Sequence, residues 1–309
     1  MTLDLFNPGY ASGLTTGDPL LSHQGRGKDY GIYLQDQVAL DPQVKLMAGL
    51  RADRFSNRAL ESDAVTGRGQ QSALSPRLGA VWQPWERTSF FADWSRSHAP
   101  NVGHSGSNIT YDAEVAEQFE VGVKQDILQN RLRGSVAVFD LNRKNILTTD
   151  PANPLLQVLS GHQRSRGVEV DLAGAITKGW QAIATYAYTE ATVRADTTFP
   201  VGDSLANVPR HSGSLWSTYE FQSVQGLKVG AGIYLVGSRQ ATLPNTFKLT
   251  GYARTDAMVS YQRGPWKAQL NIFNLFDRRY YTGGSAAVFN YTLNPSRPLS
   301  AQVTVSYRF

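Results

Sequence analysis

Residue types that catalyse reactions or bind metals are few in this sequence and poorly spaced for either task. The chain contains no cysteine, so it offers neither thiolate ligands nor disulfide bonds. Its histidines are far apart, and none stands in an H-E-x-x-H or similar metal-binding spacing: His23, His98, His104, His162 and His211. We interpret them as exposed polar residues, four of them in or beside loops. No catalytic residue, metal site or bound cofactor is therefore expected, and the chain is not predicted to be an enzyme.

Nucleotide and nucleic-acid binding are also disfavoured. The segment from Gly226 to Gly237 is rich in glycine, but Leu235 stands where a dinucleotide-binding G-x-G-x-x-G motif needs its third glycine. A strand whose glycines face crowded neighbours is the simpler interpretation. The formal net charge is +5, yet Lys and Arg are scattered singly and form no concentrated basic segment. We expect no nucleic-acid partner.

A chain of this composition could cross a membrane as β-strands but not as helices. Charged residues make up 18% of the 309 residues and aromatic residues 11%, with 28 glycines. The longest apolar runs, such as Val136 to Phe139, fall far short of the roughly 18 residues that a transmembrane helix needs. A membrane-spanning strand needs an apolar residue only at alternate positions, so the mean hydropathy of −0.32 does not argue against a barrel wall.

Apolar and polar residues alternate in several segments, which predicts β-strands with one apolar face. The clearest case is the C-terminal segment from Ala301 to Phe309, and the pattern recurs at 44–51, 118–124 and 266–272. We expect the following apolar residues on the convex, lipid-facing side of a barrel: Val44, Leu46, Ala48, Leu50, Val121, Val123, Leu270, Ile272, Val303 and Val305. The concave side should carry Lys45, Arg51, Glu120, Lys124, Gln269 and Arg308.

The connections between these segments alternate between short and long. Tight links are expected at 41–43, 84–86, 176–178 and 263–265, and long polar links at 56–72, 97–113, 145–162, 194–206 and 278–297. In outer-membrane barrels the turns on the periplasmic side are short and the extracellular loops are long. Four tryptophans lie beside the short links, as a periplasmic aromatic girdle would require: Trp82, Trp85, Trp180 and Trp266.

The number of strands indicates an incomplete barrel. We count about thirteen strands from Lys28 to Phe309, whereas single-chain bacterial barrels have an even number. Residues 1–27 would then be the remnant of an extracellular loop, and residues 1–14 lack the features of a secretory signal. We therefore expect an open half-barrel, with a gap between its first and last strands.

Eight short motifs follow one another in an order that resembles a known family. They are FNPGY at 6–10, YGIYLQDQ at 30–37, GLRAD at 49–53, SPRLGAV at 75–81, EQFEVGVK at 117–124, SRGVEV at 165–170, NIFNLFD at 271–277 and YRF at 307–309. Each is weak alone, but together they cover nearly the whole chain. The sequence resembles TonB-dependent siderophore receptors of the ferrichrome, coprogen and pyoverdine type.

This resemblance implies an all-β transmembrane meander, comprising about 13 strands of a 22-stranded outer-membrane barrel at residues 28–309. The signal peptide, TonB box, plug domain and about nine strands would be missing. The full-length protein would import a ferric siderophore, energised by TonB through the missing N-terminal region. Outer-membrane lipid would surround the wall, the C-terminus would be periplasmic, and Tyr307 and Phe309 would form the barrel-assembly signal.

A ligand should bind on the extracellular side, where aromatic rings give a rigid surface and hydroxyl groups orient a bulky metal chelate. The aromatic residues of the long loops that are nearest to such a mouth are Tyr111, Tyr280, Tyr281, Phe289 and Tyr291. Charges inside the barrel should pair across neighbouring strands or contact the plug: Arg51, Asp53, Arg77, Glu120, Lys124 and Glu169.

Two other functions remain open at this point. A passive porin or another outer-membrane channel would share the wall pattern but would need no plug. A soluble all-β binding or carbohydrate-active protein would also show alternating strands.

Overall fold

The computed structural model describes residues 23–61, 64–101, 111–150, 152, 157–286 and 291–309. Side chains are described in the same ranges except at 23–25, 59–61, 64–68, 285–286 and 291. The regular elements in these ranges are all β-strands. The described part of the chain holds no helix of the length and apolar character that a membrane crossing requires.

Thirteen strands form one sheet in the order β1-β2-β3-β4-β5-β6-β7-β8-β9-β10-β13-β14-β17. Their bounds are β1 (His23–Ala39), β2 (Val44–Glu61), β3 (Ala64–Trp85), β4 (Thr88–Ala99), β5 (Glu114–Ile127), β6 (Leu132–Thr149), β7 (Gln157–Thr177), β8 (Trp180–Ala195), β9 (His211–Glu220), β10 (Leu227–Val236), β13 (Tyr252–Arg263), β14 (Trp266–Phe273) and β17 (Ser300–Tyr307). Two small hairpins accompany the sheet, β11 (Arg239–Gln240) with β12 (Lys248–Leu249) and β15 (Tyr281–Ala286) with β16 (Tyr291–Pro295).

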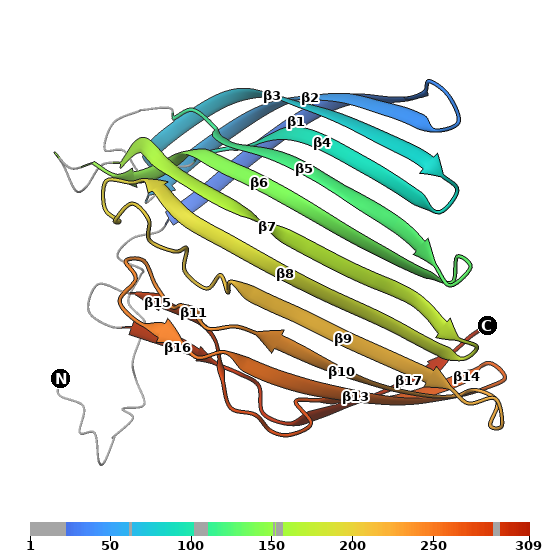
Figure 1. The fold of residues 1–309 in the computed structure, drawn as a ribbon. Helices are drawn as coiled ribbons and strands as arrows, with labels where there is room; N and C mark the ends of the chain where they lie inside the picture. Colours follow the sequence, from blue (N-terminus) through green and yellow to red (C-terminus); the bar gives the residue numbers. More distant parts are fainter. Residues whose placement is uncertain (1–22, 62–63, 102–110, 151, 153–156, 287–290) are drawn as a thin grey trace, which may run out of the picture.

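Every pair of neighbouring strands in the large sheet is antiparallel. The sheet curves like part of a cylinder, with the tight turns at one end and the long connections at the other (Figure 1). The terminal strands β1 and β17 each have one neighbour in this sheet, so the curved wall is open. The predicted antiparallel meander of 13 strands and the open half-barrel are both confirmed.

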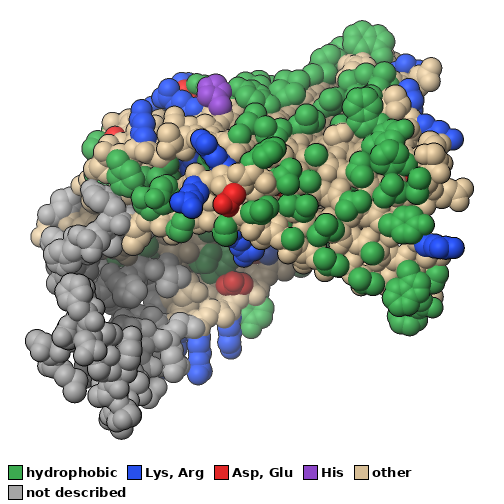
Figure 2. Space-filling view, turned by 90° about the horizontal axis from the view of Figure 1, so that it is seen from below, with side chains coloured by type: hydrophobic (Ala, Val, Ile, Leu, Met, Phe, Trp, Pro, Cys, Tyr) green, Lys and Arg blue, Asp and Glu red, His purple; other side chains and the backbone are tan. Residues whose placement is uncertain are grey.

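The pairing register shows that the two faces of the sheet differ in polarity. One cross-strand row joins Leu46, Ala80, Ala92, Val121, Val138 and Val168. The adjacent row on the opposite face joins Met47, Gly79, Asp93, Glu120, Phe139 and Gly167. Figure 2 shows hydrophobic side chains spread over the outer surface of the curved sheet. The two residue sets predicted for the convex and concave sides lie on opposite faces, as expected.

Ion pairing on the concave face differs from the prediction. Arg51 pairs with Asp53 at 2.7 Å, but these residues are two positions apart on β2 instead of on neighbouring strands. Lys124 lies 4.8 Å from the centre of the Phe91 ring. A cation can be stabilised by the negative face of an aromatic ring, which explains why Lys124 needs no carboxylate directly opposite.

Several strands extend further towards the loops than the sequence pattern indicated. β1 begins at His23, so residues 23–27 are strand and not loop. β2 extends to Glu61 and β3 begins at Ala64, both within the segment 56–72 that was expected to be a long link. β6 and β7 likewise shorten the expected link at 145–162. The residues of the β2–β3 extension are mostly polar, a composition typical of loops. The hairpin ladder nevertheless pairs their backbone groups, and this stabilises strand structure without a continuous apolar face.

The four tryptophans beside the tight turns are exposed at the turn end of the wall, as predicted. Trp82 stacks on Phe90 with ring centres 5.6 Å apart, and Trp266 meets Tyr307 edge-on at 4.8 Å. Trp180 donates a hydrogen bond from Nε1 to Ser217 Oγ at 2.7 Å. Each ring has an apolar body on the surface and a polar N–H group that can reach a partner, as an aromatic girdle requires.

Aromatic rings lie over glycines on the concave face. A Cβ atom at Gly232 would come within 2.2 Å of the Trp216 ring and 3.0 Å of the Leu215 carbonyl oxygen. The glycine is therefore needed for close packing between β9 and β10, as the sequence pattern indicated for this segment.

We predict that Gly232→Ala destabilises the protein by about 1–3 kcal/mol, because the added methyl group overpacks the Trp216 ring. Gly69→Ala is the matched control, since a Cβ there meets no atom within 4 Å. Urea unfolding in detergent, followed by tryptophan fluorescence, measures both. Equal midpoints for the two variants would contradict this account of the packing.

Candidate functional site

A cluster of aromatic and cationic side chains lies on the concave face of β10 and β13, near the loop end of the wall. Tyr234 on β10 and Arg254 on β13 are directly opposite in the register. The guanidinium carbon of Arg254 lies 4.4 Å from the centre of the Tyr234 ring, a cation–π contact. The pairing register of β10 and β13 alone therefore brings Tyr234 and Arg254 into contact.

A buried carboxylate holds Arg254 in place and joins β13 to the connection that follows β14. Asp256 accepts a hydrogen bond from Arg254 Nη2 at 2.9 Å, and its other oxygen accepts from the Asn274 backbone N–H at 2.8 Å. Only 4% of Asp256 is exposed. Because both carboxylate oxygens are satisfied, the buried charge is compensated within the fold.

Asn274 continues this network into the long connection before β17. Its side-chain oxygen accepts from the Arg278 backbone N–H at 2.9 Å. Its amide nitrogen donates to the carbonyl oxygens of Arg278 and Arg297, both at 3.0 Å. Asn274 adopts a left-handed conformation with φ of 54°, which asparagine tolerates better than most residues. The two ends of the connection are thereby drawn together over the wall.

This arrangement brings a tyrosine of the connection onto the strand. Tyr280 stacks on Tyr252 with ring centres 3.8 Å apart and an interplanar angle of 18°. The guanidinium carbon of Arg239 lies 5.7 Å from the Tyr252 ring centre. Arg239 Nη2 donates to the backbone oxygens of Tyr281 and Thr282 at 2.8 and 2.9 Å.

Each of the two arginines has a nitrogen atom that the described residues leave without an acceptor. Arg239 Nη1 and Arg254 Nε are buried nitrogen atoms without a hydrogen-bond partner among the described residues. The cluster defined by Tyr234, Arg239, Tyr252, Arg254 and Tyr280 thus combines flat aromatic surface with spare guanidinium donors. Such a surface is chemically suited to a flat or anionic ligand.

The five residues predicted from the sequence to bind the ligand do not all lie in this cluster. Tyr280 belongs to the cluster, and Tyr281 lies beside it with 47% of its surface exposed. Tyr111 is buried, and its hydroxyl donates to the Gln157 carbonyl oxygen at 2.7 Å, which ties the start of β5 to β7. Phe289 lies outside the described residues, and for Tyr291 only the backbone in β16 is described.

The terminal pair that the resemblance assigns to barrel assembly lies at the turn end. Tyr307 and Phe309 meet edge-on with ring centres 5.1 Å apart.

Four cluster residues were not singled out from the sequence: Tyr234, Arg239, Tyr252 and Arg254. Tyr252, Arg254 and Asp256 stand at alternate positions and so mark one polar face of β13. This alternation was the only feature of the sequence that could have pointed to the site. Their meeting with Tyr234 and Tyr280 depends on strand register and on the return of the connection.

The histidines match the expectation in part, since His211 is exposed whereas His98 and His162 are half-buried. All three lie in strands, where their rings contact Ser75 at 3.0 Å (His98), Asn142 at 3.2 Å (His162) and Tyr186 at 2.9 Å (His211). Among the residues that the structure describes, no group of three or more histidine or acidic side chains could hold a metal ion.

We predict energetic coupling between Arg254 and Asp256 in a double-mutant cycle. Asp256→Ala should cost about 1–3 kcal/mol, because it leaves the Asn274 N–H and Arg254 without their acceptor. The combined Arg254→Ala and Asp256→Ala variant should be less destabilised than the sum of the single variants. Urea unfolding midpoints give the four values, and strict additivity would contradict the proposed network.

Comparison with known proteins gives the family. Residues 2–275 match the family described as TonB dependent receptor-like, beta-barrel. The metal-pseudopaline receptor CntO of Pseudomonas aeruginosa is 34% identical over 288 residues, which cover 89% of this chain and 40% of the receptor. The ferrichrome outer membrane transporter/phage receptor of Escherichia coli is 32% identical over 264 residues, which cover 82% of this chain and 35% of the transporter.

A solved structure shows the same fold. The siderophore receptor PiuA from Acinetobacter baumannii superposes with a TM-score of 0.80 at 26% identity, covering 92% of this chain and 44% of PiuA. The chain thus spans about 40% of the length of these curated receptors. Its matched sequence and its antiparallel wall lead to one conclusion: the chain belongs to the β-barrel family of TonB-dependent receptors.

Proposed function

We propose that the protein that carries this chain imports a ferric siderophore across the bacterial outer membrane, energised by TonB. The observation that carries the proposal is the aromatic and cationic cluster on the concave wall of a TonB-dependent receptor barrel. The names of the relatives support it, since CntO is a metal-pseudopaline receptor and PiuA a siderophore receptor. The chain contributes wall and loops, and no enzymatic activity is proposed.

The orientation that we propose places the long connections outside the cell and the tight turns in the periplasm. The C-terminus, at the turn end in Figure 1, would then be periplasmic. Short periplasmic turns and long outer loops are general in such barrels, and the tryptophans at the turn end agree with one aromatic girdle.

The ligand class that we propose is an anionic ferric chelate. Arg239 and Arg254 place two positive charges near one another, and among the described side chains only the carboxylate of Asp256 pairs with either of them. Spare guanidinium donors form strong, directional hydrogen bonds with carboxylate or catecholate oxygens. Tyr252 and Tyr280 supply the flat apolar surface.

Coupling to TonB is proposed to run through a plug segment outside these 309 residues. A passive porin was the alternative from the sequence. It is not favoured, because the matched family and the curated relatives are TonB-dependent receptors.

We predict that uptake requires TonB. Cells that depend on this protein should accumulate ⁵⁵Fe supplied as a ferric tris-catecholate, and deletion of TonB should reduce the uptake to background. The tris-catecholate in this assay stands for the anionic class, with a ferric hydroxycarboxylate as the second anionic probe. If deletion of TonB leaves the uptake of either chelate unchanged, the protein acts as a passive channel.

We predict further that the charge of Arg254 contributes to ligand affinity. Arg254→Gln should weaken binding of the anionic chelates about tenfold, as expected for one lost charge-assisted hydrogen bond, and should leave a neutral ferric trihydroxamate almost unaffected. Arg254→Lys keeps the charge and controls for it, and Arg263→Gln at the turn end controls for a general loss of positive charge. Equal losses for neutral and anionic chelates would contradict the electrostatic role.

A further inference from the structure

A single asparagine joins the connection between β8 and β9 to two other connections at the loop end of the wall. Asn207 donates its backbone N–H to the Gln240 carbonyl oxygen on β11 at 2.8 Å. Its side-chain oxygen accepts from the Gly284 N–H on β15, and its side-chain nitrogen donates to the Gly284 carbonyl oxygen, both at 3.0 Å. Asn207 and Gly284 are 77 positions apart in the chain. Asn207 thus ties together the β8–β9, β10–β13 and β14–β17 connections (Figure 1).

The side-chain amide of Asn207 pairs with Gly284 as a peptide group pairs with a neighbouring strand. A side-chain amide carries both an acceptor and a donor, so it can bind the N–H and the C=O of one residue at the same time. Asn245 repeats this arrangement between the β10–β13 and β8–β9 connections. Its side chain accepts from the Ser204 N–H and donates to the Ser204 carbonyl oxygen, both at 2.8 Å. Two side-chain amides therefore hold the three connections together.

Close packing beneath Asn207 holds the β15–β16 hairpin against the β10–β13 connection. Ala241, which follows β11 directly, is 0% exposed. A Cβ atom at Gly284 would come within 3.0 Å of the Ala241 Cβ and 3.3 Å of the Ala241 carbonyl oxygen. Asn207 has a φ of 63°, a left-handed conformation that asparagine tolerates better than most residues. We call Asn207, Ala241 and Gly284 the loop junction.

The loop junction is connected to the ligand cluster at two points. Gly284 lies on β15, and the first two residues of this strand present their carbonyl oxygens to Arg239 Nη2 at 2.8 and 2.9 Å. Tyr280, whose ring stacks on the wall, stands immediately before β15. Gln240, which accepts from Asn207, is the neighbour of Arg239 on β11. A displacement of the hairpin would therefore move one aromatic ring and one guanidinium group of the cluster together.

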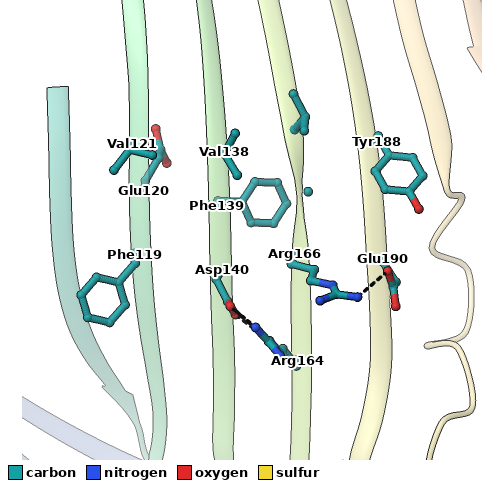
Figure 3. Close-up of a pocket in the computed structure, with 12 residues that line it drawn as sticks. Phe119, Glu120, Val121, Val138, Phe139, Asp140, Arg164, Arg166, Tyr188 and Glu190 are labelled. Carbon is teal, nitrogen blue, oxygen red and sulfur yellow. Dashed lines mark hydrogen bonds and ion pairs between the residues drawn. The ribbon is translucent and has the colours of Figure 1, made fainter. Parts of the chain in front are cut away.

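The ion pairs on β6, β7 and β8 are contacts of a different kind. Arg164 pairs with Asp140, and Arg166 pairs with Glu190 at 3.1 Å (Figure 3). The backbone ladder already joins these three strands, so the loss of an ion pair should leave their arrangement unchanged. Asn207, in contrast, joins β11 to β15, and these strands belong to two separate small sheets. The loss of its side chain should therefore change how the two sheets lie against one another.

We propose that Asn207 is a positioning residue for the ligand, because it holds Tyr280 and Arg239 in the arrangement that receives the chelate. The inference rests on the proposed function and deepens it, since it assigns part of the affinity to a residue of a third connection. A site that is ordered before the ligand arrives does not lose binding free energy to the ordering of its parts. If the hairpin is docked for only a fraction of the time, the affinity falls by that fraction.

The test is isothermal titration of the full-length protein that carries this chain, purified in detergent. The probes are a ferric tris-catecholate and a neutral ferric trihydroxamate. Asn207→Gly allows the left-handed backbone and removes only the side-chain amide. It should weaken binding of both chelates about fivefold, because an undocked hairpin displaces the aromatic ring as well as the guanidinium group. This result differs from the one expected for Arg254→Gln, which should affect the anionic chelate alone.

Two control variants should bind both chelates as tightly as the wild type. Asn130→Gly is the matched control, since Asn130 has a φ of 66° in the tight turn between β5 and β6 at the other end of the wall. Arg166→Gln combined with Glu190→Gln removes an ion pair between strands that the ladder joins. If Asn207→Gly does not fold, Gly284→Ala disturbs the loop junction from the other partner and should cause a similar loss of affinity.

A double-mutant cycle in ligand binding separates positioning from a general structural role. Once Tyr280→Ala has removed the positioned ring, Asn207→Gly should weaken binding by a smaller factor than it does in the wild type. Equal factors in the two backgrounds, or wild-type affinity of Asn207→Gly, would overturn the proposal and leave the proposed function intact. A wild-type protein that binds neither chelate would contradict the proposed function itself, and this inference with it.

Discussion

The backbone hydrogen-bond ladder is the constraint on which the rest of this structure depends. A chain that crosses hydrocarbon must pair its N–H and C=O groups within the protein, because unpaired groups cost several kcal/mol each there. In this chain twelve antiparallel pairings of the large sheet meet that requirement between neighbouring strands, and the outer edges of β1 and β17 have no partner among the described residues. The ladder also continues past the apolar band, through the polar hairpin of β2 and β3. Strand length is thus set by backbone pairing, and only the membrane-facing part is set by apolar side chains.

The ladder fixes which side chains can meet. Because the side-chain period is two, a shift of one residue would exchange the apolar and polar faces of a whole strand. The register keeps Val121 and Val138 outside and Glu120 inside. The register also determines which charges lie opposite one another on the outer face. Arg166 lies opposite the carboxylate of Glu190 on the next strand, whereas Arg26 lies opposite another arginine, Arg58.

The candidate site arises where the wall meets a folded connection. Asp256 belongs to β13 but binds the backbone of Asn274, which lies just beyond β14. That hydrogen bond, together with the turn at Asn274, returns Tyr280 to the wall and stacks it on Tyr252. The strands give the site a rigid floor, while the connection supplies its second aromatic ring. A ligand surface of this kind can vary through the connection without any change in the barrel.

Local sequence patterns were sufficient to predict the architecture and the two faces of the sheet. Strand number, strand direction and the inward or outward position of residues such as Lys45 and Val303 follow from alternation, which is a local property. The positions of the tryptophans followed from the same pattern. The extent of the strands into segments such as 56–72 could not be predicted, because polar residues form strands there only when a partner strand is present.

The residues that form the candidate site, in contrast, are brought together by long-range contacts of the fold. Tyr234 and Arg254 are twenty positions apart, and Arg239 and Tyr280 are forty-one positions apart in the printed sequence. Their contacts require a specific register and a specific path of the connection after β14. Tyr111 illustrates the same limit, since its aromatic character suggested a ligand contact while its hydroxyl binds the first residue of β7 from the segment before β5. Residue type can indicate what a side chain is able to bind, but its partners are set by long-range pairing that local sequence does not encode.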